Sequence, residues 1–302
     1  MTVVQTRKNT IKASPARKVF NVINYTFCIA IAILCLVPVL HIFAISFSSK
    51  LEVMSGHVGL FPKGFTLENY RVIMQDMQFF RSYSVTILRA IVGWAISIVL
   101  VVLAAYPLSQ RESSFPARKY IVVYFMIAMI FNGGMIPTYL VVSEIGLIDS
   151  FWALIFPCAI SIYNITLMMN FMKALPDSLQ ESAFIDGANH FTVLFRIILP
   201  LCLPSIATIS LFIVMHHWNA WFDGSIYIRT PSMKPLQTYL RSCIIVESIE
   251  TAAVGLDEAE NLISADASNG AKIFLTMLPI LCVYPFLQKY FAKGIIRGSV
   301  KE

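Results

Sequence analysis

The chain has 302 residues, of which 57% are hydrophobic and 13% are charged, and its mean hydropathy is +0.72. This composition excludes an ordinary water-soluble domain, in which roughly 25% of the residues carry a charge. The net charge is +6, but no basic patch with interleaved aromatic residues accompanies it, so we expect no nucleic acid partner. The six cysteines show neither a disulfide framework nor a metal-ligand spacing. The composition therefore predicts an integral membrane protein.

Long apolar runs divide the chain into segments. A helix needs about 20 consecutive apolar residues to cross the hydrocarbon core of a bilayer, and six runs meet this requirement. The first run is too long for a signal-peptide core and lacks a clear cleavage site, so we interpret it as a retained helix. We therefore predict an all-α polytopic protein with six transmembrane helices. The predicted spans cover residues 22–47, 82–108, 119–142, 151–172, 197–217 and 272–292.

The basic residues predict the orientation of these spans. Lys and Arg occur in the amino-terminal tail 1–21, in the connections after the second and fourth spans, and in the carboxyl-terminal tail 293–302. Because such residues are retained on the cytoplasmic side, both termini are expected in the cytoplasm. The segments 48–81 and 218–271 then form external loops, and the latter contains more acidic than basic residues.

Two features along the chain bear on local structure. In the first external loop, Leu67–Gln78 is predicted to form a short interfacial helix. In the third span, Gly133, Gly134 and Pro137 weaken helical pairing near the outer half. Broken backbone at that depth is tolerated only against protein or water, so residues 131–139 are a candidate wall of a pathway. Close helix packing by small residues explains the same pattern equally well.

The segment 176–196 is polar and charged, although it lies between two apolar runs. Asp177 and Ser178 each precede an amide or acidic residue by three positions, which is the spacing of a capping box. A short helix is therefore expected to begin here and to run to Gly187, where positive φ allows a turn. A second amphipathic piece then leads back to the membrane. We predict a helix, a turn and a helix at the cytoplasmic surface.

This segment resembles the coupling loop of ATP-binding-cassette (ABC) importer permeases. That pattern reads Glu-Ala-Ala, then Gly four residues on, then Ile-x-Leu-Pro, and Ser182 is its one departure within the triplet. An ordinary surface loop is the alternative interpretation. The matching positions are Glu181, Ala183, Gly187, Ile197, Leu199 and Pro200. The resemblance implies that Glu181 pairs with an arginine of the ATPase and that Gly187 acts through its shape. The residues assigned to ATPase coupling are Glu181, Ser182, Ala183, Asp186, Gly187, Leu199 and Pro200.

The carboxyl-terminal sequence 285–302 resembles that of maltose-type permeases for carbohydrates, notably the permeases of polysaccharide-fragment importers. The resemblance implies a type I importer permease in a bacterial plasma membrane, working by alternating access. It also implies several partners: a second permease in a heterodimer, two ATPase subunits, an extracellular solute-binding protein, a carbohydrate substrate of the oligosaccharide class, and the surrounding lipid bilayer. The segment 218–271 is expected to form a lid-like external element. Within it, 229–250 either contacts the binding protein or lies flat on the membrane.

The sequence contains no phosphate-binding loop of the Gly-x-x-x-x-Gly-Lys-Ser/Thr type. We therefore expect no cofactor in this chain, with ATP and Mg bound and hydrolysed by the partner subunits. His216 and His217 are adjacent and have no Glu or Cys at ligand spacing, so no metal site is predicted. No arrangement of Ser and His residues specifies a nucleophile.

Polar and aromatic residues inside apolar spans are candidates for a translocation path, because polar groups are costly when they face lipid. Each of them, taken singly, is also consistent with a structural role. Arg89 is the sharpest, since a guanidinium inside a span needs a partner, a cavity or a substrate, or else must reach water at the outer surface. One hypothesis is that Arg89 favours anionic oligosaccharides. The candidates are Arg89, Asn132, Tyr163, Asn164, Asn170, His217, Trp218 and Asn219.

Other classes of membrane protein remain as alternatives. A secondary transporter driven by an ion gradient is expected to carry acidic residues in its spans, and the six predicted spans contain none. A membrane scaffold or receptor would leave the coupling loop unexplained. Importer permeases for amino acids, phosphate or peptides share that loop, so the prediction of a carbohydrate depends on the carboxyl end and the overall pattern.

Overall fold

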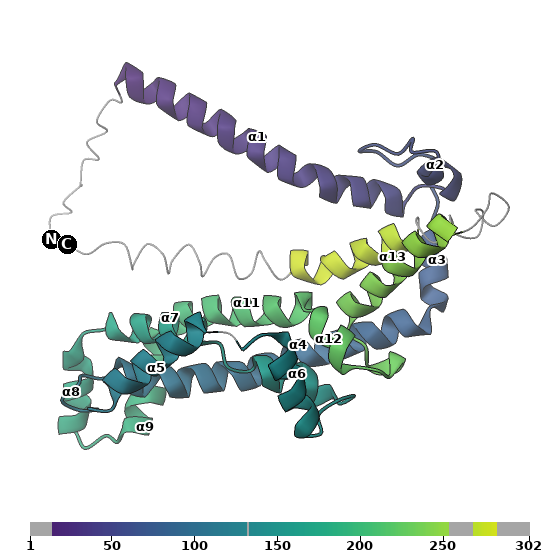
Figure 1. The fold of residues 1–302 in the computed structure, drawn as a ribbon. Helices are drawn as coiled ribbons and strands as arrows, with labels where there is room; N and C mark the ends of the chain where they lie inside the picture. Colours follow the sequence, from purple (N-terminus) through teal and green to yellow (C-terminus); the bar gives the residue numbers. More distant parts are fainter. Residues whose placement is uncertain (1–13, 132, 254–267, 283–302) are drawn as a thin grey trace. The chain divides into compact units, whose positions relative to one another are not determined.

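The computed structural model describes residues 14–131, 133–253 and 268–282, and over residues 246–253 it describes the backbone alone. Every regular element in this part of the chain is a helix, which confirms the predicted all-α class (Figure 1). The chain divides into two compact units. One comprises Met1–Tyr70 with Ile263–Phe274, and the other comprises Arg71–Leu262 with Leu275–Glu302.

The first unit is dominated by the 32-residue helix α1, Pro15–Ser46. Ser14 caps it, because its hydroxyl accepts a hydrogen bond from the Arg17 amide at 3.3 Å, and Pro15 suits the first helical position. Among the residues of this helix only Ala44 and Ser46 are buried. A helix of this length with an apolar surface on all sides fits a bilayer.

Polar contacts at the end of α1 fix the segment 48–81, the predicted first external loop. This segment contains α2, Lys50–Met54. The buried amide of Asn69 donates to the carbonyl oxygens of Ser46, at 3.1 Å, and of Ser48, at 3.0 Å. The Tyr70 hydroxyl donates to the Ser46 hydroxyl at 2.9 Å. One buried side chain thus satisfies two carbonyl groups where the long helix ends.

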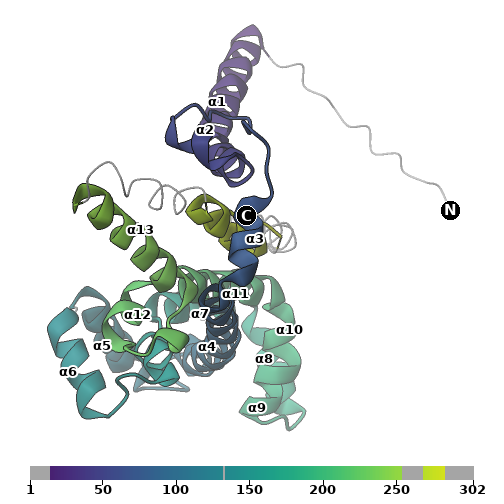
Figure 2. The ribbon, with the colours of Figure 1, turned by 90° about the vertical axis from the view of Figure 1, so that its right-hand side faces the viewer.

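The second unit is built on α4 (Met77–Ser109), α7 (Ile162–Lys173) and α11 (Leu203–Asn219). α4 starts at Asp76, whose carboxylate accepts from the Phe79 amide at 3.0 Å. It runs unbroken for 33 residues and packs along both of the other helices (Figures 1 and 2). The apolar core between the three helices includes Val101, Met168 and Ile209, none of them measurably exposed. α4 is therefore one continuous rod through this unit.

The remaining helices are short and surround this centre. Leu67–Gln78 was predicted as one helix, but α3 ends at Gln75 because Asp76 begins the next helix. The others are α5 (Arg118–Ile130), α6 (Met135–Glu144), the 3₁₀ turns Phe151–Leu154 and Phe156–Cys158, α8 (Asp177–Ile185), α9 (His190–Val193), the π-helical turn Leu194–Ile198, α10 (Leu199–Leu201), α12 (Phe222–Tyr227), the 3₁₀ turn Pro231–Met233, α13 (Leu236–Ala253) and an apolar helix Ser268–Cys282.

The predicted spans correspond to the helices to different degrees. α1 and α4 are each long and apolar enough to cross a membrane. Three bent pairs are apolar and long enough to be further candidate spans, or re-entrant loops: α5 with α6, the 3₁₀ turns with α7, and the segment from α9 to α11. The break between α5 and α6 falls at the predicted weak point, and Asn132 within it lies outside the described residues. Of the sixth predicted span, 272–292, only residues up to 282 are described, so the number six stays a prediction.

The predicted span 197–217 contains a sharp bend. The chain bends by 83° between Leu201 and Leu203, so only α11 continues as a straight apolar helix. Prolines at 200 and 204 flank the bend, and each removes a backbone donor from a continuous helix. As a result, Leu199 and Pro200 lie in the same arm as α9.

The start of the segment 218–271, predicted to be an external loop, folds back onto α4. The Leu236 amide donates to the Thr86 hydroxyl at 2.8 Å, and the Tyr239 hydroxyl donates to the Asp76 carboxylate at 2.6 Å. The guanidinium of Arg241 lies 3.5 Å from the ring centroid of Trp221. Leu236 and Tyr239 therefore attach this segment to the amino-terminal part of α4, and the lid-like element stays a prediction. Residues 254–267 of that loop lie outside the described part.

Candidate coupling surface and polar pocket

The coupling segment forms the predicted helix, turn and helix. α8 begins after Pro176, which is its capping residue and supplies no side-chain hydrogen bond. The predicted capping box is therefore wrong. The carboxylate of Asp177, instead of accepting a backbone amide, accepts from Arg111 at 2.9 Å. An ion pair with a guanidinium has displaced the local cap, and the pattern in the sequence did not reveal it.

Arg111, in the turn after α4, holds two carboxylates of α8. Its Nη1 donates to Glu181 Oε1 at 2.9 Å, while its Nε donates to Asp177 Oδ2. The two acidic residues are four apart, so both project from one face of the helix. The hydrogen bond and charge of Asp177, followed by the charge of Glu181, raise the pKa of Arg111 above its ordinary value. All three side chains are more than half exposed, so the pairs orient α8 more than they stabilise the fold.

Two further contacts join α4 to the coupling segment. Gln110 Nε2 donates to Gln180 Oε1 at 3.1 Å, and the Tyr106 hydroxyl lies 3.0 Å from His190 Nδ1. Ala183 is buried and belongs to the apolar core of α4 and α7. A larger side chain at 183 would push α8 outward. The last turns of α4 and the coupling segment therefore form one packed block.

The outer face of this block is open. Gly187 has φ +83°, as predicted for the turn, and a Cβ added there would meet no atom within 4 Å. Glu181, Ser182, Asp186 and Pro200 are exposed, and Leu199 is half-buried. Of the seven predicted coupling residues, Ala183 is buried, Leu199 is half-buried and five, including Gly187, are exposed. This exposed set is hereafter called the coupling surface.

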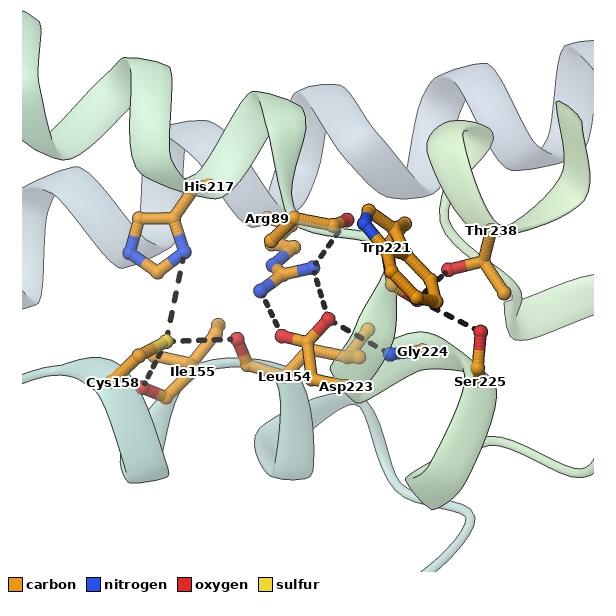
Figure 3. Close-up of polar contacts among 11 residues, drawn as sticks. Arg89, Leu154, Ile155, Cys158, His217, Trp221, Asp223, Gly224, Ser225 and Thr238 are labelled. Carbon is orange, nitrogen blue, oxygen red and sulfur yellow. Dashed lines mark hydrogen bonds and ion pairs between the residues drawn. The ribbon is translucent and has the colours of Figure 1, made fainter. Parts of the chain in front are cut away.

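In the first half of α4, Arg89 is completely buried and bound to Asp223 (Figure 3). Arg89 Nη1 donates to Asp223 Oδ1 at 3.2 Å and to the Ala220 carbonyl oxygen at 3.4 Å, and Nη2 donates to the second carboxylate oxygen. Such a two-pronged pair is geometrically specific. The guanidinium has thus found a protein partner, and the geometry speaks against direct contact between Arg89 and a solute.

A polar pocket of about 350 Å³ lies beside this ion pair, between α4, α7 and α11. Its lining includes Cys158, Ile160 and Ser161, from the stretch where the chain bends by 50° between the 3₁₀ turns and α7. His217, on α11, lies 4.0 Å from Cys158 Sγ through its Nδ1 (Figure 3). The pocket is lined by Ser97, Val101, Cys158, Ile160, Ser161, Asn164, Phe212, Ile213, His216 and His217. Polar and apolar side chains therefore both line this pocket within the transmembrane unit.

The sequence is similar to known transport proteins over most of its length. Residues 120–297 match the family of binding-protein-dependent transport system inner membrane components. The chain belongs to this family. The permease is 39% identical over 289 residues to the polygalacturonan/rhamnogalacturonan transport system permease protein YtcP of Bacillus subtilis, covering 94% of this chain and 99% of that one. It is 40% identical to the protein LplC of the same organism, covering 97% and 98%.

A solved structure shares the fold. A chain of a bacterial ABC transporter involved in the import of the acidic polysaccharide alginate superimposes with a TM-score of 0.82. The two chains are 31% identical, and the match covers 92% of the permease and 99% of its neighbour. The predicted type of fold, an ABC importer permease, is confirmed.

The permease brings together only some of the predicted pathway residues. Asn164 is buried at the polar pocket together with His217. Tyr163 is exposed, with its ring centroid 6.4 Å from that of Phe212 at the pocket edge. The other candidates do not line it: Asn170 and Asn219 are exposed, and Trp218 lines a separate apolar cavity of about 170 Å³.

Several residues of these sites were not predicted. Asp223 was missed because the whole segment 218–271 was assigned to an external loop, although the unmatched charge of Arg89 was a signal that a carboxylate should exist. Arg111 was counted only as a marker of orientation. Ser97 and Ser161 are small polar residues without any local signal. Among the described residues no three His, Cys, Asp or Glu side chains gather to hold a metal ion.

Proposed function

We propose that this permease is one of two transmembrane subunits of an ATP-driven importer of carbohydrates, specifically oligosaccharides. The observation that carries the proposal is the similarity to a polygalacturonan/rhamnogalacturonan permease, which extends over nearly the whole of both chains. The coupling surface supports it, because its exposed residues match the loop by which importer permeases contact their ATPases. The polar pocket supports it as well, since alternating polar and apolar walls suit sugar rings.

The proposal includes the partners. A second permease subunit completes the translocation path, two ATPase subunits bind and hydrolyse ATP with Mg, and an external solute-binding protein delivers the sugar. The chain lies in the bacterial plasma membrane with both termini in the cytoplasm. The coupling surface then faces the ATPases, while residues 220–241 and the 143–150 connection face outward.

In the proposed mechanism, motion of the ATPases reaches the pocket through α4. When the cassettes close on ATP, they push on α8. Arg111 and Gln110 tie α8 to the end of α4, and Tyr106 of α4 contacts His190 of α9. Because α4 is continuous, the push also moves the end that carries Arg89. Closure opens the path to the outside and hydrolysis resets it, which is a rigid-body switch between two states.

The test is uptake and ATPase activity of the complete transporter in lipid vesicles with its binding protein and a panel of oligosaccharides. We expect one class of sugar to stimulate hydrolysis only when the binding protein is present. Gly187→Trp should abolish stimulation and uptake, because the bulk prevents the ATPase from seating on α8. Gly187→Ala is the matched control, since it shares the positive φ but adds only a methyl group.

Two results would overturn the proposal. Stimulation by an amino acid or phosphate instead of a sugar would keep an importer and reject the carbohydrate. Uptake that continues without any ATPase would indicate a secondary transporter. That class expects a carboxylate in the membrane, and Asp223 does lie beside a transmembrane helix, but Arg89 neutralises its charge.

A further inference from the structure

We propose that the tip of the predicted first external loop, residues 58–62, inserts into the surface of the bilayer and anchors the first unit there. The partner is the lipid of the leaflet at the carboxyl-terminal end of α1, which is the external leaflet in the orientation proposed above. Leu60 and Phe61 are the inserted side chains. The inference concerns the membrane setting of this unit and does not depend on which solute the permease transports.

The loop that follows α2 turns back and runs beside the last turns of α1 (Figure 1). The Nδ1–H of His41, on α1, donates to the Gly59 carbonyl oxygen at 2.9 Å. The loop returns to the end of the helix at Lys63, whose amide donates to the Ser48 hydroxyl at 3.0 Å. Residues 59–63 therefore run antiparallel to α1, from the level of His41 to a level just beyond the end of the helix.

The hydrogen bond from His41 sets the depth of this loop tip. After Lys18, α1 carries no Asp, Glu, Lys or Arg, and from there to Ser46 it rises by about 42 Å at 1.5 Å per residue. This length matches the roughly 40–45 Å of a bilayer with its headgroups. His41 lies five residues before the end of the helix, which is about 7–8 Å below it. Segments at a membrane interface bury their apolar side chains about 5–10 Å deep, so Gly59 lies at the depth of such a segment.

The loop tip presents apolar side chains outward. Phe61 is 81% exposed and Leu60 is 44% exposed, whereas Val58 is buried and packs inside the unit. No Asp, Glu, Lys or Arg occurs between Glu52 and Lys63. Burying Leu60 and Phe61 in lipid removes their apolar surface from water, which is favourable, while the long side chain of Lys63 can keep its charge among the headgroups. The pattern of charges therefore fits a lipid surface.

The direction of the loop favours lipid over a soluble protein as the partner. A water-soluble protein docks above the headgroups, so a loop that served it would extend past the end of α1. This loop runs back below that end instead, and the Gly59 carbonyl supplies the polar partner that an imidazole needs at the membrane boundary. The loop thus satisfies His41 and turns Leu60 and Phe61 toward the bilayer.

The experiment places the photoreactive residue p-benzoylphenylalanine at position 61 of the complete transporter. The transporter is reconstituted in nanodiscs of radiolabelled phosphatidylethanolamine and phosphatidylglycerol, with its binding protein present, and illumination links the probe to the molecule that it touches. We expect severalfold more phospholipid adducts from position 61 than from the same probe at Glu68, an exposed acidic residue at the start of α3. The probe at Leu34, an exposed residue in the middle of α1, verifies that the photochemistry works.

Two variants without a probe test the same contact. Because the Phe61 side chain is largely exposed, Phe61→Asp removes few contacts inside the chain, but it places a charge in the lipid and should lift the loop tip out. In nanodiscs, we expect trypsin to cleave after Lys63 severalfold faster in Phe61→Asp than in Phe61→Leu. Phe61→Leu is the matched control, since it keeps an apolar side chain.

Four results would overturn the inference. Adducts of position 61 mainly with the binding protein would indicate a docking surface, and adducts mainly with another subunit would indicate a subunit interface. An unreactive position 61 beside a reactive position 34 would mean that the loop tip faces water. Equal cleavage of Phe61→Asp and Phe61→Leu would mean that insertion does not hold the loop. All four leave the proposed function standing, because uptake and ATPase activity test it separately.

Discussion

Arg111, just after the end of α4, and Arg89, in the first half of that helix, bind their carboxylate partners in opposite ways. At the coupling end, Arg111 and its two carboxylates are all more than half exposed, and Gly187 stands in open space. At the pocket end, Arg89 is fully buried against Asp223, and Gly93 touches His217. Exposed ion pairs are weak and easily exchanged, whereas a buried pair cannot be broken without leaving a stranded charge. The contrast indicates exchangeable ion pairs at the coupling surface and a fixed ion pair between Arg89 and Asp223.

The largest effect on stability is expected at the Arg89–Asp223 ion pair. Asp223→Ala leaves the buried Arg89 guanidinium without its carboxylate, which costs about 3 kcal/mol or more. We expect a clear drop in the melting temperature of the purified transporter, measured by tryptophan fluorescence. The double variant Arg89→Met with Asp223→Leu should recover most of the loss, because no charge is then stranded. If Asp223→Ala had the same melting temperature as the wild type, the Arg89–Asp223 ion pair would not stabilise the fold.

The two glycines provide a second comparison. Gly93→Ala places a methyl group 2.4 Å from His217 Nε2, so we expect a loss of about 1–3 kcal/mol from overpacking. Adding His217→Ala should restore much of it by making space. Gly187→Ala costs about 1–2 kcal/mol for a different reason, namely positive φ, and no neighbouring deletion should rescue it. Equal rescue at both positions in thermal melts would contradict this distinction.

Arg111 is expected to affect transport rather than stability. Arg111→Gln releases Asp177 and Glu181, so α8 loses its ion pairs at the end of α4, while the Gln110–Gln180 hydrogen bond and the apolar core around Ala183 remain. We expect an unchanged melting temperature and fewer sugars imported per ATP hydrolysed in vesicles. Arg196→Gln, which removes an exposed charge on the neighbouring turn, is the matched control. The same loss in both variants would mean that net charge, and not the link, matters.

The smallest effect concerns the connection at 143–150. The Asp149 carboxylate accepts from the amides of Arg229, at 2.9 Å, and Thr230, at 2.8 Å, and from the Thr230 hydroxyl. These hydrogen bonds, with that of the Thr230 hydroxyl the largest, lower the pKa of Asp149 below the ordinary 3.8. Because the folded pKa is lowered, the stabilisation is complete above the ordinary value and is lost as pH falls through the lowered one. Amide exchange at Arg229 and Thr230 should accelerate, relative to intrinsic rates, below that pH.

Asp149→Ala provides the control for this prediction. It should show the fast exchange of Arg229 and Thr230 at neutral pH and no further change on acidification. If the wild type and the variant exchanged alike at neutral pH, Asp149 would not fix the outer loop.

Part of the coupling surface could be predicted from local sequence. The turn at Gly187 was predicted because positive φ is a property of one residue, and the helix before it followed from its neighbours. The side-chain cap of that helix was predicted wrongly. Asp177 has the right type and spacing for a cap, but Arg111, 66 positions away in the chain, competes for its carboxylate. No local pattern contains that competitor.

The sequence by itself determined the apolar helical character, the membrane setting, the position of the coupling helix and the family. These follow from composition and from residues close together in the chain. Only the tertiary structure decided that Asp223 neutralises Arg89 across 134 positions, that Arg111 holds Glu181 across 70, and that Ser97, Ser161 and His217 line one pocket. The physical reason is that these contacts depend on how α4, α7 and α11 pack side by side, and periodicity within one helix does not specify its neighbours.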